Sequence, residues 1–217
     1  MILTFITGAS GQEARYRWDI GGGIGMSGYE GDANQGFIFS KPGFTATALA
    51  RYNFDTRWSV RAQAQVMTLS GDTEAAGIVL PNAANYSFSS TTFDVGARAE
   101  FNFFPYGIGE TYKRLRRWTP FVSAGLGLLM SSVESHTFTA LSIPLGVGVR
   151  YKPAKRLNLA LELTFAKTTG DHIDGPDLSD PFRIKSSFLK NTDWYSTLAV
   201  TLTYEFSERC TVCNRID

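Results

Sequence analysis

The chain has 217 residues, enough for one large domain or one barrel, and a formal net charge of +1. This balanced charge gives no electrostatic reason to expect a nucleic-acid partner, because nucleic-acid-binding domains carry a strongly basic face. No run of residues approaches the ~18 consecutive apolar residues that a membrane-spanning helix requires.

The first residues, "MILTFITGASGQ", contain a short apolar stretch that ends in small residues. Ala9-Ser10-Gly11 before Gln12 fits the small-x-small pattern of a signal-peptide cleavage site. The positively charged start of such a peptide is missing, and an ordinary first strand is the alternative. We expect residues 1–11 to be the remnant of a signal peptide and residues 12–206 to form the folded domain.

Apolar residues then alternate with small or polar residues along the whole chain. This period of two is typical of β-strands. Eight segments of 9 to 13 residues show it, a length that suits a tilted crossing of a bilayer. In chain order, the predicted strands are 18–26, 44–54, 58–68, 93–103, 122–130, 141–151, 157–165 and 194–206.

The two faces of these strands differ in a way that distinguishes a membrane barrel from a soluble sandwich. The apolar face is free of charge in all eight segments, whereas the polar face carries glycines, small hydroxyls and a few charges of both signs. Soluble sandwiches have shorter strands, and their polar faces meet water. Aromatic residues gather near the strand ends, as in interfacial girdles. The sequence therefore predicts an all-β fold, an eight-stranded antiparallel up-and-down transmembrane β-barrel of the outer-membrane type, with lipid outside.

The polar face would then line a narrow lumen. Eight strands leave an interior that side chains about fill, so we expect no open pore. Charges of opposite sign on this face should pair with one another. The predicted network joins Arg61, Arg98 and Arg150 to Asp19, Asp94, Glu100, Glu162 and Glu205.

The connections alternate in length. Long segments (27–43, 70–91 and 168–193) alternate with short turns such as "NFDT" and "KPAKR". Outer-membrane barrels place long loops outside and short turns in the periplasm, so an even strand number puts both termini in the periplasm. Two connections depart from this pattern: "PYGIGETYKRLRRW" is long and basic, and the outer loop around "VESHTF" is short.

The two cysteines, Cys210 and Cys213, lie in a C-terminal tail, residues 207–217. A C-x-x-C pair can be a redox motif, half of a zinc site or a disulfide. The two histidines, His136 and His172, are predicted at the opposite end of the barrel, and nothing predicts the helix that would activate a thiol. We expect a disulfide, either local or with a partner, and no metal or cofactor.

Two loop clusters are candidates for a catalytic site. One contains Glu134, Ser135 and His136, and the other places His172 among Asp171, Asp174 and Asp177. Neither has a recognisable motif, and loops are commonly rich in Ser and Asp. We therefore expect no catalytic residue and no enzyme, with a small outer-membrane hydrolase as the alternative.

Several stretches resemble a known family when they are taken in order. They are "GGGIGMSGYEGD", "ARYNFDTRWSVRAQ", "EFNFFPY", "TPFVSAGLGLL", "IPLGVGVRYKPAKRLNLALELTFAKTTGDHIDG" and "DWYSTLAVTLTYEF". Together they resemble the PorG-like outer-membrane β-barrels of Bacteroidota, which are associated with the type IX secretion system. Most distinctive is the Pro144-x-Gly146-x-Gly148 segment followed by Glu162 and then Asp171-His172-Ile173-Asp174. Ala166 stands where the family often has an arginine.

The resemblance implies a role in assembly and no chemistry. Proteins similar to PorG sit among outer-membrane lipids and contact a periplasmic ring of a PorK-like lipoprotein and its PorN-like partner. The implied contacts are the Cys210/Cys213 tail and a basic stretch of the long connection, Lys113, Arg114, Arg116 and Arg117. A solvated turn is the alternative for the basic stretch, and a stand-alone structural or adhesive barrel is the alternative for the whole chain.

Overall fold

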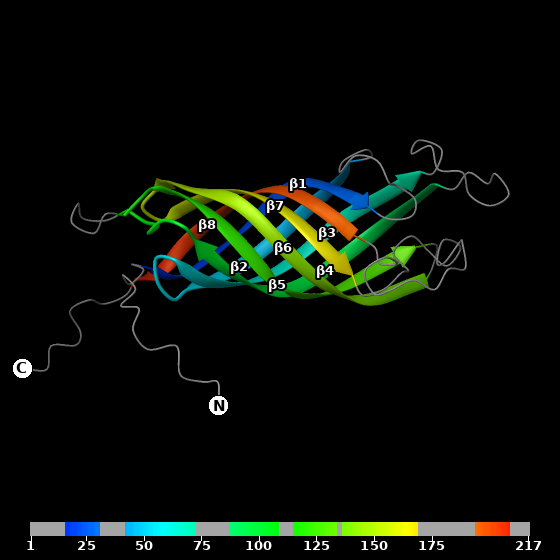
Figure 1. Cartoon of the computed structure of the whole chain (residues 1–217), viewed down its shortest axis with the longest axis horizontal. Coiled ribbons are helices and arrows are strands. Elements are labelled where there is room, and N and C mark those ends of the chain that lie inside the picture. Colours follow the sequence, from blue (N-terminus) through cyan, green and yellow to red (C-terminus); the bar gives the residue numbers. More distant parts are fainter. Residues whose placement is uncertain are drawn as a thin grey trace, which may run out of the picture.

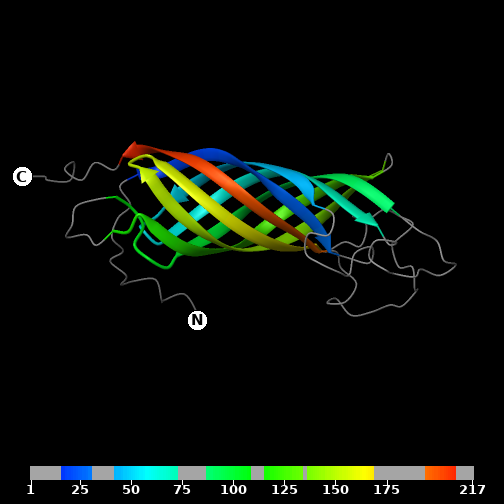
Figure 2. The same ribbon diagram turned by 90° about the horizontal axis from the view of Figure 1, so that it is seen from above.

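The computed structural model describes residues 16–30, 42–72, 87–108, 115–133, 136–168 and 194–208. These residues form one closed antiparallel barrel in which every strand pairs with its neighbours in sequence and β1 pairs with β8 (Figures 1 and 2). The strands are β1 (Tyr16–Glu30), β2 (Gly43–Asn53), β3 (Trp58–Asp72), β4 (Ser87–Asn102), β5 (Trp118–Val133), β6 (His136–Ala154), β7 (Leu157–Thr168) and β8 (Trp194–Glu208).

All eight predicted segments are strands, and the predicted fold class is confirmed. Most strands are longer than predicted and range from 11 residues in β2 to 19 in β6. The extra length lies mainly at the long-loop end, where polar stretches such as "SSTT" at the start of β4 continue the pairing with β3. Apolar alternation could not reveal the "SSTT" extension because its side chains are polar on both faces.

The faces of the sheet are arranged as predicted, with polar side chains inside and apolar side chains outside. Ile20, Ile24, Leu126 and Leu145 on the outer surface are each more than half exposed. Inside, the largest fully buried side chains include Arg51, Arg61 and Arg150. A soluble barrel would show the reverse arrangement, with its apolar side chains in the core.

One end of the barrel carries the short connections, and this end is called the short-turn rim below. The connections there are residues 54–57, 103–117 and 155–156, and β1 begins beside the end of β8. At the other end, the short link around "VESHTF" is confirmed, because β5 ends at Val133 and β6 begins at His136. The three other connections at that end lie largely outside the described residues.

An aromatic girdle surrounds the barrel just inside the short-turn rim. Trp18 packs edge-on against Tyr52 with ring centroids 4.9 Å apart, and Trp58 lies 4.8 Å from Phe101. Such rings prefer the level of the lipid headgroups. Among the described residues, no helix is long and apolar enough to span a membrane.

Candidate functional site

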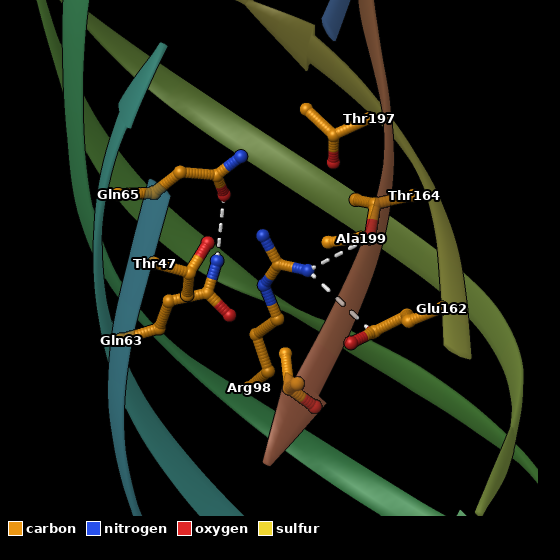
Figure 3. A pocket seen from close by; sticks show the side chains of 9 residues that line it. Thr47, Gln63, Gln65, Arg98, Glu162, Thr164, Thr197 and Ala199 are labelled. Atoms are coloured by element: carbon orange, nitrogen blue, oxygen red, sulfur yellow. Dashed lines mark hydrogen bonds and ion pairs between the residues drawn. The ribbon is translucent and has the colours of Figure 1, made fainter. Parts of the chain in front are cut away.

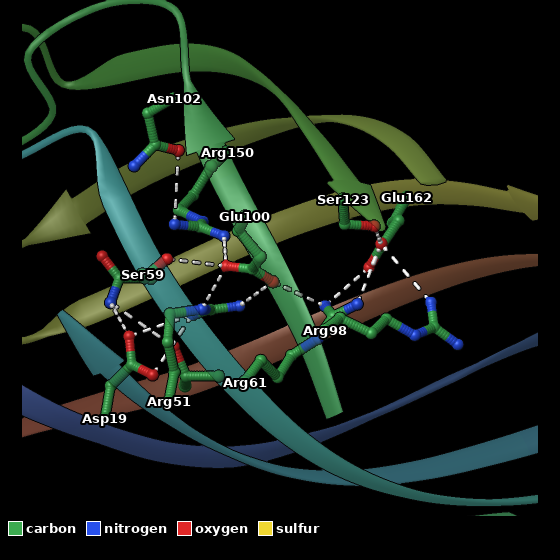
Figure 4. A network of polar contacts seen from close by, with 12 residues as sticks. Asp19, Arg51, Ser59, Arg61, Arg98, Glu100, Asn102, Ser123, Arg150 and Glu162 are labelled. Carbon is green, nitrogen blue, oxygen red and sulfur yellow. Dashed lines mark hydrogen bonds and ion pairs between the residues drawn. The ribbon is translucent and has the colours of Figure 1, made fainter. Parts of the chain in front are cut away.

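The inward-facing side chains nearest the short-turn rim form a connected cluster of charges (Figure 4). Glu100 on β4 lies at its centre and is completely buried. Arg51 Nε donates to its carboxylate at 2.6 Å and Arg150 Nη2 at 2.7 Å, and Arg61 Nη1 lies 3.1 Å away. Ser59 Oγ adds a hydrogen bond at 3.0 Å. One carboxylate therefore ties together strands β2, β3, β4 and β6.

A second carboxylate, Glu162 on β7, continues the cluster toward the middle of the lumen. Arg61 donates to it through two nitrogens at 2.7 and 2.9 Å, and Ser123 Oγ donates at 2.8 Å. Arg98 Nη1 lies 3.7 Å from the same carboxylate and donates to Thr164 Oγ1 at 3.1 Å. Because Arg61 contacts both Glu100 and Glu162, the two centres form one network.

Two cations in the lumen were missed by the sequence analysis. Arg51 donates to both oxygens of Asp19, at 3.0 and 3.2 Å, in addition to its contact with Glu100. Lys152 pairs with Glu205, whose carboxylate also accepts a hydrogen bond from Asn158 Nδ2 at 2.9 Å. The signal was available in the strand alternation, because both cations occupy inward positions of their strands.

The structure thus places all eight predicted lumen residues inside the barrel, but the predicted pairing needs correction. Asp19 and Glu205 pair with the two missed cations and not with Arg61, Arg98 or Arg150. Asp94 accepts hydrogen bonds from Ser142 Oγ at 2.6 Å and from Tyr195 Oη at 3.0 Å. Alternation gives the face of each residue but not its height along the axis, and height decides which charges meet.

Charge in the described lumen is balanced, with five buried cations and five buried anions. Burying a charge without a partner costs several kcal/mol, so each of these groups needs partners across the barrel. The cations are Arg51, Arg61, Arg98, Arg150 and Lys152, and the anions are Asp19, Asp94, Glu100, Glu162 and Glu205.

Glycine allows the network to approach the barrel wall. Gly146 on β6 faces the lumen, and a Cβ atom added there would collide with the Ser123 hydroxyl and the Glu162 carboxylate. At Gly127 on β5, an added Cβ atom would likewise collide with the Ser142 hydroxyl and press on the Asp94 carboxylate. The inward glycines therefore create the space that the charged side chains fill.

A small cavity remains beside Arg98, about large enough for one water molecule (Figure 3). Its lining includes Gln63, Gln65, Glu162 and Thr197. Arg98 Nη2 has no hydrogen-bond partner among the described residues, and the guanidinium lies between the glutamines and the Thr164–Glu162 side of the lumen. The side chains of Gln63, Gln65, Arg98 and Thr197 around it are buried, which fits the narrow interior of an eight-stranded barrel.

Tyr106, in the connection from β4 to β5, covers the lumen at the short-turn rim. Its hydroxyl donates to Asn158 Oδ1 at 2.8 Å, and its ring lies 5.3 Å from the Lys152 ammonium. Its backbone N–H donates to the carbonyl of Thr56 at 3.2 Å. Burial raises the pKa of the Tyr106 phenol, so the hydroxyl remains a donor at neutral pH. The first, described part of the long connection is therefore fastened across the mouth of the barrel.

The predicted partner contacts are only partly within the described residues. Arg116 and Arg117 are exposed at the short-turn rim, and Arg116 lies over the Phe104 ring at 4.4 Å. Lys113, Arg114, Cys210 and Cys213 lie outside the described residues, as do the proposed signal-peptide remnant and the acidic loop segment around His172. The described part of the chain contains no group of His, Cys, Asp or Glu side chains able to hold a metal ion.

Comparison with known families gives one decisive match. The family model described as "Domain of unknown function (DUF6089)" matches residues 1–215. The chain belongs to this family. No curated protein sequence matches the chain.

Solved structures similar to this DUF6089 member are outer-membrane barrels. Neisserial surface protein A has a TM-score of 0.55 and 12% identity, over 87% of this chain and 97% of that chain. OprG from Pseudomonas aeruginosa has a TM-score of 0.48 and 13% identity, over 90% and 98%. Ail of Yersinia pestis has a TM-score of 0.47 and 14% identity, over 89% and 100%. The likeness to the Neisserial protein concerns the fold alone.

Proposed function

We propose that this chain is an outer-membrane β-barrel that acts by assembly, as a non-enzymatic component of the type IX secretion machinery. The inverted barrel, apolar on its outer surface and packed with paired charges inside, supports the outer-membrane part of the proposal. The wall of such a barrel meets lipid and its lumen is filled, so water-soluble partners can bind it at its two rims. The secretion role rests on the resemblance of the ordered sequence stretches to PorG-like barrels.

The apolar outer surface supports residence in a lipid bilayer. A closed barrel satisfies all its backbone hydrogen bonds between strands, so it can expose apolar side chains to lipid without leaving an unpaired edge. Leu126, Leu128, Leu145 and Val147 form a continuous exposed apolar area across the paired strands β5 and β6. In water, this surface would be a severe aggregation hazard.

The packed lumen argues against transport of a solute through the barrel. Glu100, Arg51, Arg61 and Arg150 are buried and joined across the interior, and Tyr106 covers the mouth at the short-turn rim. Solute passage would require these ion pairs to separate, which leaves charges unpartnered in the lumen. A role in assembly needs no such rearrangement.

The short-turn rim is the part of the described structure best suited to a periplasmic partner. The two described ends of the connection between β4 and β5 are held together by backbone hydrogen bonds, because Gly107 N donates to Arg116 O and Arg116 N to Pro105 O. Arg116 and Arg117 are exposed on this fastened connection. A periplasmic partner with an acidic face would meet a pre-ordered pair of cations there.

The test is co-purification from native outer membranes solubilised with thiols blocked. The proposal predicts a larger assembly that contains a periplasmic lipoprotein, identified by mass spectrometry. Replacing three cations of the connection, Lys113→Gln, Arg114→Gln and Arg116→Gln, should weaken its recovery without unfolding the barrel. Comparison of reducing with non-reducing gels, and Cys210→Ser with Cys213→Ser, shows whether the tail contributes a disulfide.

Heat-modifiable migration on gels provides the folding control, since folded barrels migrate differently before and after boiling. A lone folded monomer under all extraction conditions would contradict the assembly role. That outcome would favour a stand-alone structural or adhesive barrel.

A further inference from the structure

Four strands of the barrel begin with the same three-residue pattern. An arginine is followed by a bulky apolar residue and then by a polar residue. The strands are β1, β3, β5 and β7, all of which run away from the short-turn rim. The four triplets are Arg17-Trp18-Asp19, Arg57-Trp58-Ser59, Arg117-Trp118-Thr119 and Arg156-Leu157-Asn158.

Each position of the triplet has its own environment. The polar third residue is buried in the lumen in all four triplets, and the three tryptophans at the second position are 42–51% exposed on the outer surface. The four arginines are exposed at the rim. The pattern thus anchors each triplet from inside while it presents an apolar side chain to lipid and a cation just beyond it.

Backbone hydrogen bonds place three of these arginines at equivalent positions. The carbonyl of Arg57 accepts from Asn102 N at 2.7 Å, that of Arg117 from Lys152 N at 2.8 Å, and that of Arg156 from Glu205 N at 2.7 Å. In each case, the donor lies within the last four residues of the neighbouring strand, β4, β6 or β8. The arginines are therefore fixed at one level of the barrel, spread around its circumference.

The tryptophans of the triplets belong to the aromatic girdle. Trp18 contacts Tyr52, Trp58 contacts Phe101, and Trp118 lies 5.3 Å from Phe104. Aromatic girdles lie at the headgroup level of a bilayer. One residue further along a strand is a rise of about 3.3 Å, so an arginine next to each tryptophan is at the height of the lipid phosphates.

The described part of the rim is basic. Among the described residues it exposes six cations, whereas its acids are Glu208 and the half-buried Asp55. Asp55 Oδ1 accepts hydrogen bonds from the backbone N–H groups of Arg57 and Trp58, both at 2.6 Å. The six cations are Arg17, Arg57, Arg116, Arg117, Lys155 and Arg156.

We propose that the four triplets form a collar that binds the phosphates of anionic glycerophospholipids in the leaflet around the short-turn rim. The guanidinium group binds phosphate through two parallel hydrogen bonds, and its flat face tolerates an aromatic neighbour. The circular distribution decides between occupants. A protein partner would contact one side of the rim, whereas a lipid leaflet surrounds the barrel and meets all four triplets.

The natural reporters for this collar are its own tryptophans. The chain has four tryptophans, and Trp194 begins β8 at the other end of the barrel. In a Trp194→Phe background, the fluorescence therefore comes from Trp18, Trp58 and Trp118 alone. The protein is reconstituted in vesicles in which either phosphatidylglycerol or phosphatidylcholine carries brominated acyl chains, and quenching gives the relative affinity of the two lipids at the collar.

We expect phosphatidylglycerol to be favoured by about fivefold at a collar site, the factor that corresponds to ~1 kcal/mol per cation at an anionic surface. The preference should fall toward one in the triple variant Arg17→Gln, Arg57→Gln, Arg156→Gln, and also in 1 M salt, where the Debye length is ~3 Å. It should persist in the triple Arg→Lys variant, although with a smaller factor.

The matched control removes three cations outside the triplets, from the connection between β4 and β5: Lys113→Gln, Arg114→Gln and Arg116→Gln. This control should retain most of the lipid preference while it weakens recovery of the periplasmic partner, so the two proposals fail separately. Equal quenching by both lipids in the parent protein would overturn the collar. An equal loss of preference in both triple variants would also overturn it, because overall charge and not the triplets would then be responsible.

Discussion

The two halves of the lumen are built from the same strands but from different chemistry. Near the short-turn rim, buried side chains carry charge, and Glu100 and Glu162 collect the guanidinium groups of strands on opposite sides of the barrel. Near the long loops, the buried side chains include Met67, Leu69 and Leu129, hydroxyls such as those of Ser90 and Ser131, and one carboxylate, Asp94, whose partners are hydroxyl groups. One half is joined by ion pairs and the other by packing and short polar contacts.

This difference shows how a closed barrel is held together from within. The pair Arg61–Glu162 joins residues 101 positions apart and bridges β3 to β7 through the lumen (Figure 4). In the other half, the Ser90–Ser131 contact joins the neighbouring strands β4 and β5, and the hydrogen bond from Tyr195 Oη to Asp94 crosses the lumen from β8 to β4 without an ion pair. Cross-lumen links resist changes in the shape of the barrel, whereas contacts between neighbouring strands repeat what the backbone ladder already does. We therefore expect the charged half to dominate stability.

The largest effect should follow from Glu100→Gln. The substitution keeps the size of the side chain but leaves Arg51, Arg61 and Arg150 without their shared negative charge. Removal of one partner from a buried ion network typically costs about 3–5 kcal/mol. Urea unfolding of the barrel in vesicles, followed by tryptophan fluorescence, measures the loss. A free energy of unfolding within ~1 kcal/mol of the parent protein would show that the charged half is not dominant.

A smaller loss is expected when Lys152 is replaced by Met at the edge of the same half. Glu205 would retain its hydrogen bond from Asn158 but lose its ammonium partner, for a cost of about 2–3 kcal/mol. The double variant Lys152→Met, Glu205→Leu should recover most of this loss, because a buried ion pair can often be replaced by apolar side chains of similar volume. Failure of the double variant to recover would indicate that Glu205 has a further role.

Gly146→Ala tests the space that the network needs. The added methyl group would press on the Ser123 hydroxyl and the Glu162 carboxylate, and overpacking of this kind costs about 1–3 kcal/mol. The same unfolding experiment measures the effect. Combination with Glu162→Gln keeps the steric conflict, whereas combination with Ser123→Gly relieves part of it, and the second double variant should therefore be the more stable one.

The smallest effect is expected in the long-loop half. Ser90→Ala removes the 2.6 Å hydrogen bond to Ser131. Loss of one such hydrogen bond typically lowers the free energy of unfolding by about 1 kcal/mol. If this change proved as costly as Glu100→Gln, the distinction between the two halves would lose its energetic meaning.

The sequence predicted the barrel well because two simple patterns agreed. The period of two identified the strands, and the absence of charge on one face identified that face as the outside, as at Ile20, Ile24 and Leu126. Strand ends were harder to predict, because polar residues occupy both faces at the long-loop end of β4 and β6. Hydrogen bonding between neighbouring backbones continues there whatever the side chains are.

The sequence predicted which residues face the lumen but not which of them pair with one another. Alternate residues of a strand point to opposite faces, so the position of a residue within its strand shows whether it lies on the polar face. Arg61 and Glu100 were both predicted to face the lumen for this reason. Pairing depends on the shear of the barrel, which sets the relative height of residues on different strands. The sequence of a single strand does not show its height relative to the other strands. The partners of Asp19 and Glu205 were therefore found only in the structure.

Paired charges close the lumen, so the protein acts through its rims. The decisive measurement is the conductance of single barrels in planar lipid bilayers. The parent protein should be silent, and discrete current steps should appear only when cross-lumen links are removed, as in Glu100→Ala with Glu162→Ala. Stable current steps from the folded parent protein would contradict a closed lumen.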